Sequence, residues 1–276
     1  MMGTVLRRLR SLRENMVNFL EILVKDALET VRSGYYNINF KVGNVSNKVS
    51  LRGSIISCPH APIIAEVKPV SPSYGRLRQI TDIAKLAREI EDGGAVGISM
   101  LTEPKHFGGS LISLAEVKRN VKLPVLMKDI IVDPIQIEAA ANIGADAILL
   151  IYSVFKRGYV EYSLKDFIDL AHSKGLEVLL EVHAKEEFLS AIEADADLIG
   201  VNNRDLSTLK VDLNATRDIL SSTDVRDKII VSESGIRSAE DIRILRGYGA
   251  RAFLIGSAIM LADDVKGKVR ELVSAL

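Results

Sequence analysis

The sequence predicts an α/β protein built as a single (β/α)8 TIM barrel with an N-terminal helical extension. Eight short apolar segments recur along the chain, and helical patterns alternate with them. The chain has 276 residues, close to the roughly 250 residues that such a barrel usually takes. An open doubly wound sheet is the alternative, but it is less favoured because no glycine fingerprint follows the first predicted strand.

The bulk composition is that of an ordinary globular protein, with 47% hydrophobic residues, 26% charged residues and a formal net charge of +0. This balance gives no overall attraction to nucleic acid or to a membrane surface, and no apolar run is long enough for a membrane span. The single cysteine, Cys58, cannot form an internal disulfide, which indicates a reducing, cytoplasmic location. The histidines lack the spacing of structural zinc ligands, so we expect no metal.

Residues 1–60 are expected to form the helical extension, packed on a catalytic barrel that spans residues 61–276. The start of the chain is basic and amphipathic, as in a transit peptide. Acidic residues such as Glu14, Glu21 and Asp26 argue against that alternative, because transit peptides are poor in acids.

Each predicted strand is apolar on both faces and too short for a core helix, which is typical of a buried parallel sheet. In chain order the strands are PIIAEVK (62–68), VGISMLT (96–102), PVLMKD (124–129), AILLIY (147–152), EVLLEV (177–182), LIGVNNRD (198–205), IIVSES (229–234) and AFLIGS (252–257). The segments NIGADAILLI, EADADLIGV and GYGARAFLIG each end a helix and begin a strand, and glycine ends the helix in two of the three.

Polar residues gather at the carboxyl ends of these strands, where the active site of such a barrel lies. Glu66 and Lys68 end the first strand and share a face, because alternate residues of a strand point the same way. The later strands contribute Lys128 and Asp129, then Glu181, then Asn202, Asn203, Arg204 and Asp205, then Glu233, Ser234 and Gly235, and finally Gly256 and Ser257.

This convergence indicates either a compensated ion-pair network or catalysis, because an unpaired buried charge is costly. Catalysis is favoured for Lys68, Lys128 and Glu181, since each ends a short apolar run with one long charged group. A dry site is expected to lower the pKa of such a lysine, so that it exchanges protons with the glutamate as partner. Both interpretations stay open for Asp129, Arg204 and Asp205.

The loops after the seventh and eighth strands place glycine and serine where a helix begins. Gly235 follows Ser234, and Gly256 precedes Ser257. Backbone N–H groups at a helix N-terminus bind anions, and these two loops form the usual phosphate site of a barrel. A phosphorylated small molecule is therefore the first ligand to expect.

Several segments together resemble the indole-3-glycerol-phosphate synthase family of tryptophan biosynthesis. They are IIAEVKPVSPS, ISMLTEPKHFGGS, LPVLMKDIIVDPIQIEAAANIGADAILLI, LEVLLEV, GVNNRDLSTLKVD, VSESGIRSAEDI and FLIGSAIM, in family order from about residue 62 to 260. The resemblance implies a carbon–carbon lyase that needs no cofactor. Its reaction closes 1-(2-carboxyphenylamino)-1-deoxyribulose 5-phosphate to indole-3-glycerol phosphate, with loss of carbon dioxide and water.

The resemblance also implies roles for individual residues. Lys128 is similar to the general acid that protonates the substrate carbonyl, and Glu181 to the acid/base used for the loss of water. Lys68 resembles the lysine that binds the substrate carboxylate, and Glu66 its neighbouring acid. Substrate-binding positions are Asn202, Arg204, Glu233 and Phe107, and phosphate-binding positions are Ser71, Ser234, Gly235, Gly256 and Ser257.

The chain departs from the family pattern in the first loop. The family commonly reads E-x-K-R-K-S-P-S there, whereas this chain reads EVKPVSPS, so Pro69 and Val70 replace two cations. Gly108 stands where the family often has a polar residue. Proline fixes φ and removes an N–H group, which is expected to alter the motion of this loop over the substrate.

Two other functions stay open from the residues alone. One is another phosphate-binding barrel lyase or isomerase, which would share the glycine and serine loops without needing LMKD and Glu181. The other is a weakly active ligand-binding homologue, or a partner subunit of other tryptophan-pathway enzymes, favoured by the lost cations.

Overall fold

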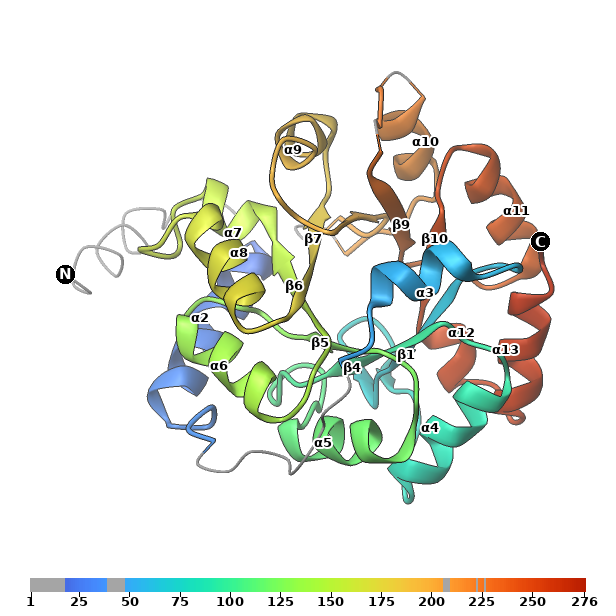
Figure 1. Ribbon diagram of the computed structural model, residues 1–276, viewed down its shortest axis with the longest axis horizontal. Coiled ribbons are helices and arrows are strands. Elements are labelled where there is room, and N and C mark those ends of the chain that lie inside the picture. Colours follow the sequence, from blue (N-terminus) through green and yellow to red (C-terminus); the bar gives the residue numbers. More distant parts are fainter. Residues whose placement is uncertain (1–17, 39–47, 206–208, 222, 226) are drawn as a thin grey trace.

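The computed structural model describes residues 18–38, 48–205, 209–221, 223–225 and 227–276, and it contains a closed barrel of eight parallel strands (Figure 1). The order around the barrel is β1-β10-β9-β8-β7-β6-β5-β4. The strands are β1 (Ile63–Val67), β4 (Gly97–Leu101), β5 (Val125–Lys128), β6 (Ala147–Ile151), β7 (Glu177–Val182), β8 (Leu198–Asn202), β9 (Ile229–Glu233) and β10 (Ala252–Ile255). The predicted barrel is thereby confirmed.

Helices follow the strands and form the outer ring that Figure 1 shows. They are α4 (Ile83–Asp92), α5 (Leu111–Asn120), α6 (Pro134–Asn142), α8 (Leu164–Ser173), α9 (Lys185–Ala191), α10 (Asn214–Leu220), α11 (Ala239–Gly247) and α13 (Val265–Val273). Two short helices, α7 (Tyr152–Lys156) and α12 (Ser257–Met260), begin directly after β6 and β10. Glycine ends a helix at two of the predicted helix-to-strand connections. Gly144 and Gly249 have φ values of 87° and 111°, which residues other than glycine rarely adopt.

The strands are buried on both faces, as their continuous apolar composition predicts. All residues of β1, β4, β6, β8, β9 and β10 are buried. Their side chains alternate between the interior of the barrel and the layer beneath the helices. The polar groups that these strands do bury are therefore placed against a large apolar background, which decides the electrostatics of the site.

The described part of the N-terminal extension contacts both ends of the barrel. After α2 (Phe19–Arg32), the hydroxyl of Tyr36 donates to Asp129 Oδ2 (2.9 Å) at the carboxyl end of β5. In the first turn of α3 (Leu51–Ser57), the backbone N–H of Arg52 donates to Glu177 Oε2 (2.9 Å) at the start of β7. Residues 1–17 and 39–47 lie outside the described residues, and the boundary between residues 60 and 61 stays a prediction.

Every predicted strand except 177–182 ends earlier than expected, and one hairpin was not predicted. β5 ends at Lys128 and β8 at Asn202, so Asp129 and residues 203–205 belong to loops. Residues 206–208 lie outside the described part. After β1, β2 (Val70–Ser71) and β3 (Gly75–Arg76) pair antiparallel. Two residues in each strand give too little alternation for this pair to be predicted.

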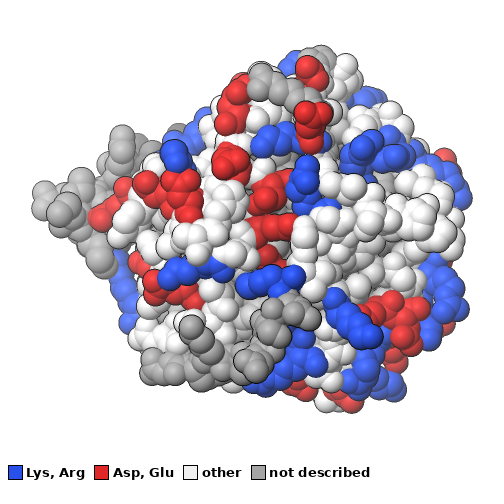
Figure 2. All heavy atoms as spheres, viewed as in Figure 1, with Lys and Arg blue, Asp and Glu red and all other residues white. Residues whose placement is uncertain are grey.

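Charges of both signs are interspersed on the face shown in Figure 2, and an uncharged area lies over α3. This mixture agrees with the net charge of +0. No helix in the described ranges is both long and apolar enough to cross a membrane.

Candidate active site

Four charged residues form one layer at the carboxyl end of the barrel. Glu66, Lys128, Glu181 and Glu233 come from β1, β5, β7 and β9, which are alternate strands of the ring. Alternate strands of a TIM barrel supply the inward side chains of one layer, which explains why these four meet. Lys128 Nζ donates to Glu233 Oε2 (2.7 Å) and to Glu181 Oε2 (3.2 Å).

Lys68 adds a second cation to this charged layer, just beyond the carboxyl end of β1. It is two residues after Glu66 and forms an ion pair with Glu66 Oε1. The predicted shared face of these two residues is confirmed. Asn202, at the end of β8, donates from Nδ2 to Glu181 Oε1 (3.0 Å) and fixes that oxygen.

Two glycines make room for the carboxylates. A Cβ atom on Gly200 would lie 2.1 Å from Glu233 Oε1, and a Cβ atom on Gly256 would lie 2.5 Å from Glu66 Oε1. Atoms at such distances overlap, so any larger residue would displace the acid. Gly256 was predicted as a phosphate-binding position, and the structure gives its missing side chain this second reason. The role of Gly200 could not be predicted from the sequence, because a glycine within a buried strand has several ordinary explanations.

The charge state of Lys128 differs from the expectation. Burial alone would lower the pKa of Lys128, but Glu233, Glu181 and Glu66 outweigh burial and raise it above its ordinary value. The expectation of a lowered pKa is therefore wrong for this lysine. The expectation considered only the effect of a dry site. It left out the three acids that the closed barrel places around Lys128. Lys128 is held as an ammonium group.

The three carboxyl groups differ from one another. Burial raises the pKa of Glu181 and Glu66, but the lysines outweigh it, and both pKa values lie below their ordinary range. For Glu233 burial prevails over Lys128, and with repulsion from Glu181 it raises the pKa to about 7. Three acids share two lysines, and Glu233 is the acid whose pKa lies above its ordinary value. Neighbouring acids with separated pKa values are a frequent mark of acid–base sites.

The raised pKa of Glu233 predicts a dependence of folding stability on pH. Between about pH 4.5 and pH 7 the folded protein binds a proton at Glu233 that the unfolded chain has released. The contribution of Glu233 to the free energy of unfolding is therefore fully present below pH 4.5, and it is lost as the pH rises through 7. The free energy of unfolding should fall between pH 5 and pH 8, and we expect Glu233→Gln to make this fall smaller by about 1–3 kcal/mol. Urea unfolding at both pH values measures this difference.

The exposed Glu240 of α11 provides the control for that measurement. Glu240→Gln should leave the difference between the two pH values unchanged. An equal pH dependence in Glu233→Gln and the unchanged protein would contradict a protonated Glu233.

Two adjoining pockets open at this mouth. The first has a volume of about 90 Å³ and lies over Lys128 and Glu181. Its wall is partly apolar, with Leu23 from α2, Phe107 from the loop after β4, and Ile151. The carboxylate of Glu103 accepts the backbone N–H of Phe107 (3.0 Å) and so holds this loop in place. The pocket thus combines apolar side chains with the charged groups of Lys128 and Glu181.

The second pocket is polar and shares Lys68, Arg204 and Ser234 with the first. It is also lined by Gly235, Ile236, Gly256 and Ser257, so four of the five predicted phosphate positions lie together. Ser234 and Gly235 both have positive φ, 69° and 84°, and a non-glycine residue in this conformation is uncommon away from functional sites.

Ser71 is the fifth predicted phosphate position, and it does not belong to the described lining of this pocket. Its hydroxyl is buried and lies 3.2 Å from Ser73 Oγ in the hairpin. Its phosphate role stays a prediction.

Two arginines connect the hairpin to the mouth. Arg204 Nη1 donates to Ser73 Oγ (3.3 Å), and Arg237 Nη2 donates to Tyr74 Oη (2.9 Å). Arg204 and Arg237 both line the polar pocket. Sequence reasoning missed Arg237, although it stands two residues after Gly235 in a loop already assigned to phosphate.

Asp129 and Asn203 have structural partners. Asp129 Oδ2 accepts from Tyr36 (2.9 Å) and Thr102 (2.5 Å), and this joins the extension to the barrel. Asn203 donates from Nδ2 to Glu233 O (3.0 Å) and to Ser234 O (3.1 Å), so it shapes the loop after β9. Of the two interpretations left open for Asp129, these contacts favour the structural one.

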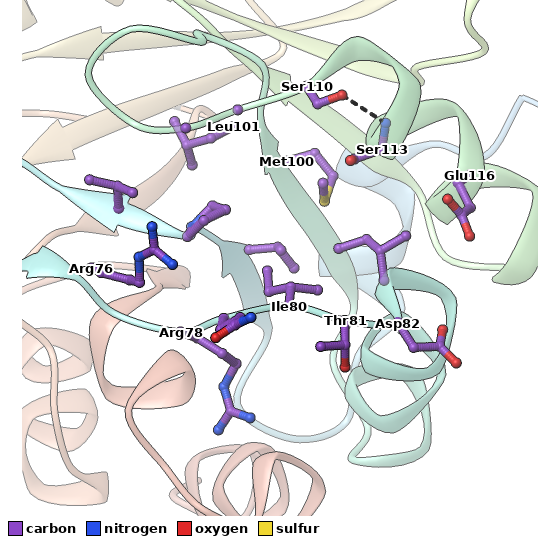
Figure 3. Close-up of a pocket in the computed structure, with 17 residues that line it drawn as sticks. Arg76, Arg78, Ile80, Thr81, Asp82, Met100, Leu101, Ser110, Ser113 and Glu116 are labelled. Atoms are coloured by element: carbon purple, nitrogen blue, oxygen red, sulfur yellow. Dashed lines mark hydrogen bonds between the residues drawn. The ribbon is translucent and has the colours of Figure 1, made fainter.

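The departures from the family pattern lie beside the mouth. Pro69, Val70 and Gly108 line a separate groove of about 760 Å³, together with Arg76 and Arg78. Figure 3 shows this groove between the segment before α4 and the start of α5. A Cβ atom on Gly108 would lie 3.2 Å from Val70 Cγ2, so the two loops touch through apolar atoms. None of the predicted site residues lines the groove.

A titratable residue that the sequence analysis did not select adjoins the charged layer. His183 Nε2 lies 3.2 Å from Glu181 Oε1, without the geometry of a hydrogen bond. It stands two residues after Glu181, which is the same spacing that identified Glu66 and Lys68. That signal was available. No group of three or more metal-binding side chains occurs within the described ranges.

The closed barrel with a charged layer at its mouth defines the class of this protein as a (β/α)8-barrel enzyme. A family model described as Indole-3-glycerol phosphate synthase matches residues 23–272. The chain therefore belongs to the indole-3-glycerol phosphate synthase family, and it is a carboxy-lyase of tryptophan biosynthesis.

Curated relatives support the same family. The indole-3-glycerol phosphate synthase of Methanopyrus kandleri is 42% identical over 255 residues, which cover 91% of this chain and 95% of the relative. That of Methanocaldococcus jannaschii is 41% identical over 253 residues, which cover 90% and 92%.

Solved structures show the fold alone. Thiamine phosphate pyrophosphorylase from Pyrococcus furiosus has a TM-score of 0.57 at 19% identity, with 82% of this chain and 97% of that chain covered. N-acetylmannosamine-6-phosphate 2-epimerase from Clostridium perfringens has a TM-score of 0.58 at 15% identity, covering 77% and 91%.

Proposed function

We propose that Lys128 and Glu181 carry out the two proton transfers by which this synthase forms the indole ring. The observation that carries the proposal is an ammonium group held between Glu181 and Glu233 beneath a partly apolar pocket. The substrate is 1-(2-carboxyphenylamino)-1-deoxyribulose 5-phosphate, which has an aromatic acid at one end and a phosphate at the other. The partly apolar pocket suits the aromatic end, and the adjoining polar pocket suits the phosphate.

In the first step, the ring carbon that bears the carboxylate attacks the substrate carbonyl carbon. Lys128 gives a proton to the carbonyl oxygen, which becomes a hydroxyl group, and the new ring then releases carbon dioxide. In the second step, Glu181 takes the proton from the neighbouring carbon and passes it to this hydroxyl, which leaves as water. The indole then becomes aromatic. Its lowered pKa supports an ionised base, and the raised pKa of Lys128 supports a charged acid.

The remaining residues bind and orient the substrate in this proposal. Phe107 faces the aromatic ring, and Lys68 binds the carboxylate and stays near the reacting atoms. Asn202 and Glu233 hold the catalytic pair through the contacts described above. Ser234, Gly235, Gly256, Ser257 and Arg204 surround the phosphate.

The compartment and the partners belong to the same proposal. The free Cys58 supports a reducing cytoplasm. Other tryptophan-pathway enzymes are the partners that the reaction suggests, because they supply the substrate and consume the product.

An assay of the unchanged protein tests this function. Addition of the deoxyribulose substrate should give the fluorescence of an indole together with one carbon dioxide per product. Binding of the substrate without turnover would instead favour the weakly active ligand-binding homologue. Turnover of an unrelated sugar phosphate, with no reaction of this substrate, would favour another barrel lyase or isomerase.

The position of Arg237 predicts a specific effect on substrate binding. Arg237→Met removes a cation from the polar pocket and frees Tyr74. We expect KM to rise about tenfold and kcat to change less than about threefold, because a phosphate held far from the reacting atoms contributes mainly uniform binding. Steady-state kinetics and competitive inhibition by inorganic phosphate measure this, and inhibition should weaken in parallel.

Arg243→Met is the matched control for that variant. Arg243 also belongs to the α11 region, but it bonds to Ala275 O and Glu240 away from the pocket. An unchanged phosphate inhibition constant in Arg237→Met would refute a role of Arg237 at the phosphate.

A further inference from the structure

The imidazole of His183 is used by none of the steps above, yet it lies against the proposed base. Its Nε2 is 3.2 Å from Glu181 Oε1, and this nitrogen is buried without a hydrogen bond among the described residues. The side chain as a whole is only 14% exposed. A buried ring nitrogen left open beside a carboxylate is costly unless the two groups interact.

A second carboxylate lies on the opposite side of the ring. His183 Nδ1 is 3.9 Å from Glu187 Oε2, which belongs to α9. Glu187 is held in place, because its Oε2 accepts the backbone N–H of His183 (3.0 Å) and its Oε1 accepts from Ser153 Oγ (2.6 Å). The imidazole thus lies between a fixed carboxylate and the carboxylate proposed to do chemistry.

The two oxygens of Glu181 have separate partners. Oε2 faces Lys128, whereas Oε1 faces Asn202 and His183. With His183 charged, both oxygens face a cation or an amide donor. With His183 neutral or absent, Oε1 retains only the amide. Lys128 then remains the one cation near Glu181 among these contacts, and Glu233 shares it.

We propose that His183 is a positioning residue for Glu181: its imidazolium bridges Glu181 and Glu187, orients Oε1, and keeps Glu181 ionised for the loss of water. This inference rests on the proposed function of Glu181. The charged groups that face His183 are Glu181 from β7, Glu187 from α9 and, farther away, Glu233 from β9. Burial alone would lower the pKa of His183, but these three acids outweigh it and raise the pKa.

The first test is the pH dependence of kcat/KM. In His183→Ala, the acid limb of the profile should move up by about one pH unit, and kcat at pH 7 should fall about tenfold with KM within about twofold. His183→Gln, which retains an amide donor, should restore part of kcat. His172→Ala is the control, since His172 pairs with Asp197 on the surface and should leave the profile unchanged.

A structural role alone would lower thermal stability and leave the acid limb in place, and that result would overturn the inference. If His183→Ala does not fold, the same pH profiles are measured on His183→Gln and Glu187→Gln. A failure of the unchanged protein to form indole product would refute the proposed function instead, so the two failures are distinguishable.

The second test does not depend on activity. Imidazole NMR of the unchanged protein, assigned through His183→Gln, should show His183 protonated at pH 7. In Glu187→Gln its titration midpoint should fall by at least about half a pH unit. A neutral His183 across pH 6–8, or an unmoved midpoint, would overturn the inference.

Discussion

Lys128→Met should reduce indole formation by about a thousandfold or more while the protein remains folded. Positioned proton transfer contributes roughly a hundredfold to ten-thousandfold, and Lys128 is also the cation that neutralises Glu181 and Glu233. Without it both acids are left buried, and they should take up protons rather than unfold the barrel. Indole fluorescence measures the rate, and circular dichroism measures the fold.

Lys165→Met is the control, because Lys165 is a surface residue of α8 paired with Asp169. It should retain full turnover. Turnover in Lys128→Met within about tenfold of the unchanged protein would remove Lys128 from the role of general acid.

Glu181→Gln should separate the two halves of the reaction. We expect indole formation to fall at least a hundredfold, because an amide cannot accept the proton that must leave with the hydroxyl group. Ring closure depends on Lys128 and should continue, so one equivalent of carbon dioxide should be released without indole fluorescence. Single-turnover mixing with both detections measures this pattern. Lys128→Met should show neither signal.

Glu177→Gln provides the comparison on the same strand. Glu177 begins β7 at the opposite end of the barrel, where it accepts from Ser50 and Arg52. It should affect stability and leave both signals intact. Simultaneous loss of carbon dioxide release and fluorescence in Glu181→Gln would show that Glu181 is needed before the loss of water.

Much of the fold could be predicted because its signals are local. Eight apolar segments without alternation can be satisfied only by strands that are covered on both sides, and regular spacing leaves room for one helix between them. Glu66 and Lys68 could be assigned to one face because strand periodicity is a property of neighbouring residues. The β2–β3 hairpin escaped prediction because two-residue strands carry no periodicity.

The site was predictable as a set of residues and not as an electrostatic arrangement. The sequence places Lys128, Glu181 and Glu233 at the ends of separate strands, and the pKa of each depends on the others. An interpretation of Lys128 by itself predicted a lowered pKa, and the three acids around it reversed the sign. Arg237 was missed for a related reason, since it contacts Tyr74, which is distant in the sequence. His183 was missed although its spacing from Glu181 was visible in the sequence.

The sequence by itself determined the barrel, the end of the barrel at which polar residues gather, and the family to which the chain belongs. Only the tertiary structure decided that the pKa of Glu233 is raised while that of Glu181 is lowered, and that Gly200 and Gly256 leave space for acids. It also showed that Pro69 and Val70 lie in a separate groove, while Lys68, Arg204 and Arg237 line the polar pocket. The physical reason is that burial and periodicity act between neighbours in the chain. Charge coupling and steric exclusion act between neighbours in space, which exist only once the barrel has closed.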